Sequence, residues 1–204
     1  MASIEFVTIE ASDPTAAEQF YSAAFGLGDR LRVRAGDAET VGFRGFTMSL
    51  ITSQPANVDA LVDAALEAGA TAVKPAAKSL WGYGGVVQAP DGTLWTIASS
   101  SKKDTGPAAR QIDDVVLQLG VEDVGTSKRF YAERGLTAAK SFGGRYVEFD
   151  TGPVKLTLNK RRALAKAAGV AAEGTGAHRL AIASDAGPFT DPDGFPWEAT
   201  SAGR

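Results

Sequence analysis

The sequence contains no cysteine and only one histidine among its 204 residues. The absence of cysteine excludes disulfide bonds, thiolate metal sites and a cysteine nucleophile, and it agrees with a reducing compartment. With one histidine, a monomer has no second imidazole to offer a metal ion. The net charge of −3 lacks the basic excess of nucleic-acid-binding proteins, so we expect no nucleic-acid partner.

Long apolar runs are also missing, since no stretch approaches the ~18 apolar residues that a membrane-spanning helix needs. The N-terminal segment MASIEFVTIEASD has neither the basic start nor the apolar centre of a signal peptide. We therefore expect a soluble cytoplasmic protein with no membrane partner.

The chain repeats two phrases in the order head, tail, head, tail. The heads are SDPTAAEQFYSAAFGL at 12–27 and EDVGTSKRFYAERGL at 122–136, and the tails are APDGTLWTIASS at 89–100 and DPDGFPWEATSA at 191–202. Such an order indicates two copies of one module. We expect a first domain at 1–100, a polar linker at 101–110 and a second domain at 111–204, each domain formed by paired units.

Copy one has the element order of two βαβββ units. A strand pattern at 4–11 leads to Asp13 and Pro14, which suit an N-cap and a first helical residue. The other elements expected here are strands at 30–35, 39–45 and 46–52, a helix at 55–69, and strands at 71–76, 81–89 and 93–99. The opening strand of the second unit is not obvious, and the run 46–52 is a candidate for both units.

Copy two repeats the first unit and then shortens. Its expected elements are a strand at 112–120, a helix at 123–134, three short strands, a short cationic helix or turn at 161–169 and a strand at 178–184. Between Ser184 and Asp191 there is no room for the helix and two strands that copy one has between Pro55 and Ala89. We therefore expect an α+β fold of tandem βαβββ modules whose last module is truncated.

Five phrases carry a family resemblance in order: FYSAAFGL, WGYGG, PDGTLW, RFYAERGL and DPDGFPWE. Through them the chain resembles the glyoxalase, bleomycin-resistance and extradiol-dioxygenase group, the vicinal-oxygen-chelate superfamily, over 4–99 and 112–200. The resemblance implies that the modules form two glyoxalase-like incomplete barrels. Each barrel would surround a cavity for a divalent metal, a substrate or a sequestered drug.

The resemblance also locates the family's metal ligands. In the family, a metal-binding histidine stands on each first strand, seven residues before the Asp that starts the helix. In this chain Phe6 and Val116 occupy those two positions. The acid after Asp-Gly-x-x-Trp corresponds to Thr96 in copy one and to Glu198 in copy two. Another acid of the pattern is replaced, in a looser alignment, by Lys155.

Copy one thus keeps no ligand, whereas copy two keeps Glu198 and His178, which matches a family histidine at the start of a strand. Two protein ligands and water would hold a divalent cation weakly, so we expect no cofactor beyond a weak metal at this pair. A homodimer could bring two such pairs together. The pair also suits a histidine base oriented by a carboxylate, or a structural histidine and a solvated glutamate.

The expected ligand contacts lie mainly in copy one. The period of two places Phe6, Thr8 and Glu10 on one strand face, and WGYGG is either an aromatic loop at a cavity or a turn with core aromatics. The residues expected to bind substrate are Phe6, Thr8, Glu10, Trp81, Tyr83 and Thr96. Our first hypothesis is a metal-independent protein that binds or sequesters a small organic ligand, as bleomycin-resistance relatives do.

The alternative hypothesis is a metal-dependent lyase, isomerase or dioxygenase of the same superfamily, with His178 and Glu198 as its catalytic residues. A third is a duplicated fold that serves only as an assembly surface. The sequence leaves open whether any reaction is catalysed.

Overall fold

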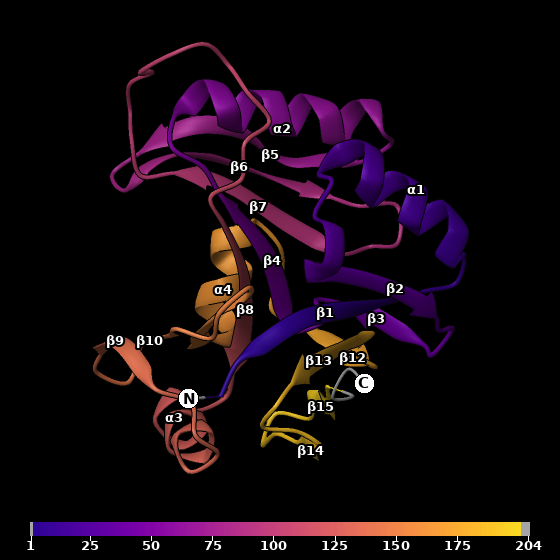
Figure 1. Ribbon diagram of the computed structural model, residues 1–204, viewed down its shortest axis with the longest axis vertical. Helices are drawn as coiled ribbons and strands as arrows, with labels where there is room; N and C mark the ends of the chain where they lie inside the picture. The colour runs from indigo at the N-terminus through magenta and orange to yellow at the C-terminus, as the bar shows by residue number, and fades with distance from the viewer. Residues whose placement is uncertain (1, 201–204) are drawn as a thin grey trace.

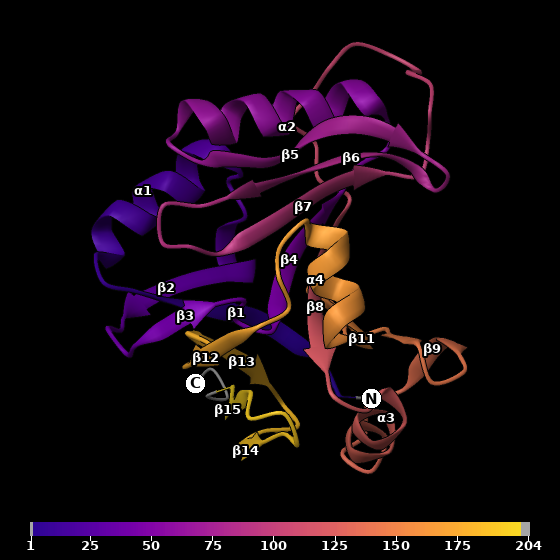
Figure 2. The same cartoon turned by 180° about the vertical axis from the view of Figure 1, so that it is seen from behind.

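The computed structural model describes residues 2–200 and combines helices with two main β-sheets (Figures 1 and 2). The helices are α1 (Pro14–Ala24), α2 (Pro55–Glu67), α3 (Val124–Ala132) and α4 (Arg161–Ala168), with a short 3₁₀ turn η1 (Gly28–Arg30). The predicted α+β class is confirmed, as are the helices expected at 55–69 and 123–134, and the segment 161–169, expected as a helix or a turn, forms helix α4. Within residues 2–200, no helix is long and apolar enough to cross a membrane.

The larger sheet is built from eight strands. They are β4 (Phe46–Ile51), β5 (Thr71–Ser79), β6 (Gly82–Gln88), β7 (Leu94–Ser99), β8 (Asp114–Val121), β9 (Ala138–Phe142), β10 (Tyr146–Phe149) and β11 (Lys155–Lys160). Their order is β5-β6-β7-β4-β8-β11-β10-β9. Because β4 is parallel to β7 and β8 is parallel to β11, two βαβββ units meet at the antiparallel β4–β8 pair. The run 46–52 therefore opens the second unit.

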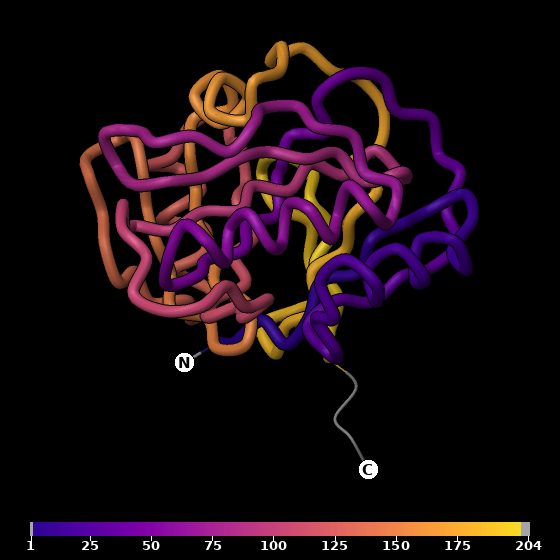
Figure 3. Tube along the Cα trace, turned by 90° about the horizontal axis from the view of Figure 1, so that it is seen from above, coloured from indigo at the N-terminus to yellow at the C-terminus, as the bar shows by residue number. Residues whose placement is uncertain are grey.

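The smaller sheet joins the two ends of the chain. Its strands are β1 (Ile4–Ala11), β2 (Leu31–Ala35), β13 (Leu180–Ser184), β14 (Phe189–Thr190) and β15 (Pro196–Ala199), in the order β14-β15-β13-β1-β2. Figure 3 shows the indigo and yellow ends of the trace running beside each other. β3 (Thr40–Gly42) and β12 (Gly174–Gly176) form a separate ribbon.

The strand order differs from the expected pairing of units within 1–100 and within 111–204. The second unit pairs with the third through β4 and β8, and the first pairs with the fourth through β1 and β13. Both sheets therefore contain strands from both sides of 101–110. A sequence repeat identifies which elements recur. It does not show which strands become neighbours in a sheet, because that depends on contacts between distant segments.

The segment expected as a linker is irregular but fastened to the start of α2. The buried Gln54 side chain accepts the backbone N–H groups of Thr105 and Gly106 at 2.7 and 3.0 Å. Its Nε2 donates to the carbonyl of Pro107 at 2.9 Å, and the Asp104 carboxylate accepts the N–H of Ala56 at 2.7 Å. These bonds hold the crossing between the second and third units in one place.

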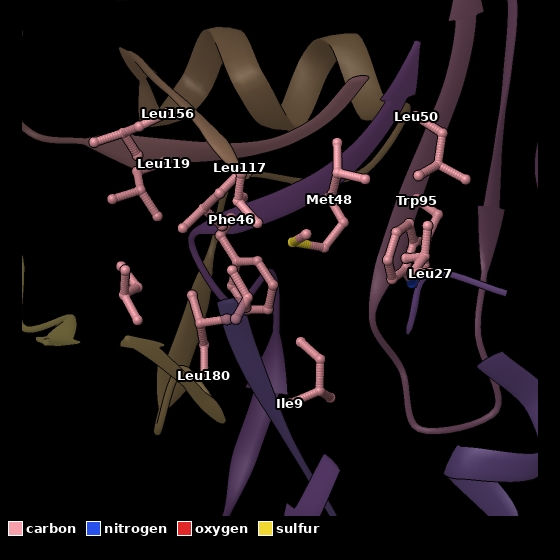
Figure 4. Close-up of a cluster of buried hydrophobic side chains, with 14 of the residues drawn as sticks. Ile9, Leu27, Phe46, Met48, Leu50, Trp95, Leu117, Leu119, Leu156 and Leu180 are labelled. Carbon is pink, nitrogen blue, oxygen red and sulfur yellow. The ribbon is translucent and has the colours of Figure 1, made fainter. Parts of the chain in front are cut away.

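The main core lies on one face of the central strands, as the period of two requires. On β4, the side chains of Phe46, Met48 and Leu50 are buried against residues such as Leu117 of β8 and Trp95 of β7 (Figure 4). The intervening β4 residues are polar and lie on the opposite face. That face is where a ligand site can form.

In both copies a hydrogen bond joins the head phrase to the tail phrase, part-buried in copy one and buried in copy two. Tyr21 of α1 donates its hydroxyl to Asp91 at 2.5 Å, and Tyr131 of α3 donates to Asp191. In each copy the tyrosine ring also packs against the tail-phrase tryptophan, with ring centroids 5.4 and 5.1 Å apart. The recurrence of Phe-Tyr with Pro-Asp-Gly thus has a physical cause, because one phrase bonds to the other.

Replacing Tyr131 by Phe leaves the Asp191 carboxylate buried without its hydroxyl donor, so we expect the free energy of unfolding to fall by about 1–3 kcal/mol. Tyr21→Phe should have a similar effect. Tyr83→Phe is the matched control, since its hydroxyl bonds an exposed carboxylate, Asp59. Urea unfolding measures all three, and a loss at Tyr131 no larger than at Tyr83 contradicts a structural role for the bond.

Candidate functional site

The face of the large sheet opposite the core is polar and carries the candidate site. Registered strand pairs place its side chains on one surface, called here the polar face. Its central residues are Thr96 and Ala98 of β7, Thr47, Ser49 and Ile51 of β4, Asp114, Val116 and Gln118 of β8, Lys155 and Thr157 of β11, and Tyr146 and Glu148 of β10.

Four strands contribute one residue each to a single row across this face. Thr96 pairs with Ser49, Ser49 with Val116, and Val116 with Lys155. Three of these are positions at which the family resemblance locates metal ligands. The row offers two hydroxyls, an isopropyl group and an ammonium group, and none of these side chains is a usual ligand of a divalent transition metal.

The residues around this row also provide no metal-binding group. No group of three or more histidine, aspartate or glutamate side chains within residues 2–200 is placed to hold a metal ion. Lys155 forms an ion pair with Asp114 at 2.9 Å, and this hydrogen bond raises the pKa of Lys155, so the row carries a positive charge. The residues of the polar face therefore do not fit the metal that the fold family implies.

Two adjoining cavities open on the polar face. The smaller, of about 160 Å³, lies over β4, β8, β11 and β10 and contains Lys155 and Gln118. The larger, of about 380 Å³, lies over β6 and β7 beside Trp81. Their linings adjoin at the β4–β7 seam, where Ser49 and Ile51 of the smaller cavity pair with Thr96 and Ala98 of the larger. We call the two cavities together the trough.

Helix α4 packs across one end of the polar face (Figure 2). Its buried Leu164, Ala165 and Ala168 form a second apolar cluster with residues of β6, β7 and the loop before β4. The approach is close, because a Cβ on Gly120 would lie 3.0 Å from the Cα of Arg161. The sequence predicts this helix but not its position at the end of the trough.

The small sheet brings together Phe6, Glu10 and Glu198, but arginine side chains already contact all three. Arg34 donates to both carboxylates at 2.7 Å, and the Arg32 guanidinium lies 3.6 Å from the centre of the Phe6 ring. The sequence analysis missed both arginines. Their alternation in RLRVRA, which places them on one face of a strand, was the available signal.

His178 lies where the chain enters β13, and both of its ring nitrogens are engaged. Nδ1 is 2.6 Å from the carbonyl oxygen of Arg44, and Nε2 is 3.0 Å from that of Asp193. The ring stacks on Phe195 with centroids 3.8 Å apart. In residues 2–200 no hydrogen bond joins His178 to Glu198, so the contacts favour a structural histidine, and the catalytic pair stays a prediction.

The expected substrate-binding residues fall into separate places. Trp81 is 84% exposed at the β5–β6 turn and lines the larger cavity together with Thr96. Tyr83 also lines the larger cavity, but its hydroxyl donates to Asp59 of α2 at 2.8 Å. Thr8 and Glu10 belong to the small sheet. One cavity anchored by Thr8, Glu10, Tyr83 and Thr96 is therefore not formed, because β1 pairs with β13 rather than with the strands that follow it.

All four tyrosines of the chain donate a hydrogen bond to a carboxylate. Burial and the Asp91 carboxylate raise the pKa of Tyr21 well above its ordinary value, and burial with Asp191 does the same for the pKa of Tyr131. The bond to Asp59 raises the pKa of Tyr83, and burial with Glu148 raises the pKa of Tyr146 to about 12.

We therefore expect the folded protein to show little tyrosinate absorbance near pH 10, whereas the chain unfolded in urea titrates there. Each folded pKa lies above the unfolded value, so the folded state retains protons that the unfolded state releases. Stability should consequently fall as the pH rises above about 10. An ultraviolet titration of folded and unfolded protein is the measurement, and coincident curves contradict the four hydrogen bonds.

Comparison with known proteins supports the fold. No protein-family model matches the sequence, and no curated protein matches it either. Glyoxalase I from Zea mays is similar in structure, with a TM-score of 0.63 and 15% identity over 98% of this chain and 92% of that one. A presumed dioxygenase from Bacillus subtilis has a TM-score of 0.54 and 12% identity over 89% of this chain and 69% of that one. The chain has the glyoxalase fold, as the sequence predicts.

Proposed function

We propose that this glyoxalase-fold chain binds a small organic ligand in the trough of its large sheet without the aid of a divalent metal. The observation that carries the proposal is the row Thr96, Ser49, Val116 and Lys155. It crosses the sheet where the fold family is expected to hold its metal, and it offers neither carboxylate nor imidazole.

The chemistry of the trough supports an organic ligand. Small side chains and backbone line the larger cavity at Ala77, Gly84 and Ala98, which leaves room for a flat apolar group beside Trp81. The hydroxyls of Ser49 and Thr96 stand at the seam between the cavities. An apolar cavity with a few placed polar groups is typical of small-molecule sites. The alternative enzyme built on His178 and Glu198 has less support, because other partners engage both side chains.

The first test is metal titration of the purified chain. We expect no stoichiometric binding of Ni²⁺, Co²⁺, Fe²⁺ or Zn²⁺ with a Kd better than about 1 μM. The double variant Val116→His, Thr96→Glu is the positive control, since it places an imidazole and a carboxylate in the same row and should gain metal affinity. Stoichiometric, tight binding by the unaltered chain contradicts the metal-independent function.

The second test fills the trough. Ala98→Leu adds bulk at the seam of the two cavities, so small aromatic compounds that bind the unaltered chain should lose at least about tenfold in affinity. Ala132→Leu, an exposed position on α3, is the matched control and should leave binding unchanged. Ligand-observed NMR with an aromatic fragment set provides the measurement. Equal binding by both variants places the site outside the trough.

A further inference from the structure

The smaller cavity presents hydrogen-bond donors from adjacent strands. The Oε1 atom of Gln118 accepts the hydroxyl of Thr47 at 2.9 Å, which fixes the orientation of the amide. Its NH₂ group has no hydrogen-bond partner elsewhere in the described chain and belongs to a residue that lines the cavity. A primary amide held in this way keeps both of its N–H donors free.

Lys155 adds a charged donor in the neighbouring row. Its ammonium group has three N–H donors, and the contact with Asp114 at 2.9 Å occupies one of them. Ser49, two strands away in the same row, lines the cavity as well, and its hydroxyl bonds no other group in residues 2–200. Donors from β4, β8 and β11 thus converge on the space above Val116.

The acidic groups of the cavity each have a cationic partner. Glu148 accepts the Tyr146 hydroxyl at 3.2 Å and pairs with Lys140 at 3.3 Å, while Asp114 pairs with Lys155. Two nearby carboxylates still disfavour a doubly charged ligand such as phosphate. They leave room for a compact, singly charged acceptor that shares the Lys155 ammonium with Asp114.

We propose that the smaller cavity binds the carboxylate of a small organic acid, with Lys155, Gln118 and Ser49 as its donors. The apolar body of the acid lies in the larger cavity beside Trp81. The inference rests on the proposed function and adds the ligand class. The size agrees, since a cavity of about 160 Å³ accommodates a carboxylate and a few carbon atoms, and the rest of the molecule crosses the β4–β7 seam.

The test compares matched acid and amide fragments, phenylacetate against phenylacetamide and benzoate against benzamide, by ligand-observed NMR and calorimetry. We expect the acids to bind more tightly than the amides. Lys155→Met should weaken acid binding at least about tenfold and leave amide binding unchanged. Asp114→Asn should strengthen acid binding, because it releases the Lys155 ammonium. Lys103→Met, which removes an exposed cation that lines neither cavity, is the control and should change neither.

Several outcomes overturn the inference, and they are distinguishable from failure of the proposed function. If acids and amides bind the trough equally, or if Lys155→Met and Lys103→Met act alike, the carboxylate assignment is wrong while ligand binding stands. Displacement of the acids by inorganic phosphate at equal concentration also contradicts a singly charged ligand. If no fragment binds and Ala98→Leu changes nothing, the proposed function itself fails. Urea unfolding of each variant separates lost binding from lost folding.

Discussion

The buried bond between a tyrosine hydroxyl and an aspartate carboxylate is the interaction on which the rest of the structure depends. Each carboxylate also accepts backbone N–H groups of its own turn, at 2.7 Å from Thr93 and at 2.9 Å from Asp193 and Phe195. Burial nevertheless raises the pKa of Asp191 above its ordinary value, which shows the cost of holding a charge there. The hydroxyl reduces that cost and fixes the tail phrase against the helix of the preceding unit.

The tyrosine–aspartate bonds and the strand pairing join different pairs of units. The tyrosine bonds connect the first unit to the second and the third to the fourth, whereas the sheets connect the second to the third and the first to the fourth. The four units are therefore linked in a ring, and no unit is attached through one neighbour alone. This arrangement explains why the repeated phrases persist in two halves that otherwise differ in length.

Local patterns predict most of the elements because caps and periodicity act over a few residues. The Asp13 cap and the helices at 55–69 and 123–134 are of this kind. Strand neighbours are not local, so the pairing of β1 with β13 could not be read from the repeat. The position of α4 against Gly120 depends on a contact between distant segments and was equally inaccessible.

The candidate site, too, combines residues that local patterns identify with an arrangement that only distant contacts create. The family pattern identifies Thr96, Val116 and Lys155 one by one, but their alignment in a single row follows from the register of β7, β4, β8 and β11. Phe6 and Glu198 were assigned to different halves, and the structure places both in the small sheet with Arg34 beside Glu198. Ser49 and Gln118 carry no motif, and only their position beside Lys155 makes them relevant to a ligand.

The pairing of β1 with β13 has a consequence for the order in which the chain acquires its structure. The first strand is synthesised early, yet its antiparallel neighbour begins at Leu180. Until that segment emerges from the ribosome, one edge of β1 has no partner, and an open edge is a template for association with other chains. The central β4–β8 pair of the large sheet joins segments that are closer in sequence, with Phe46 opposite Leu119, so it can form before β1 meets its late partner.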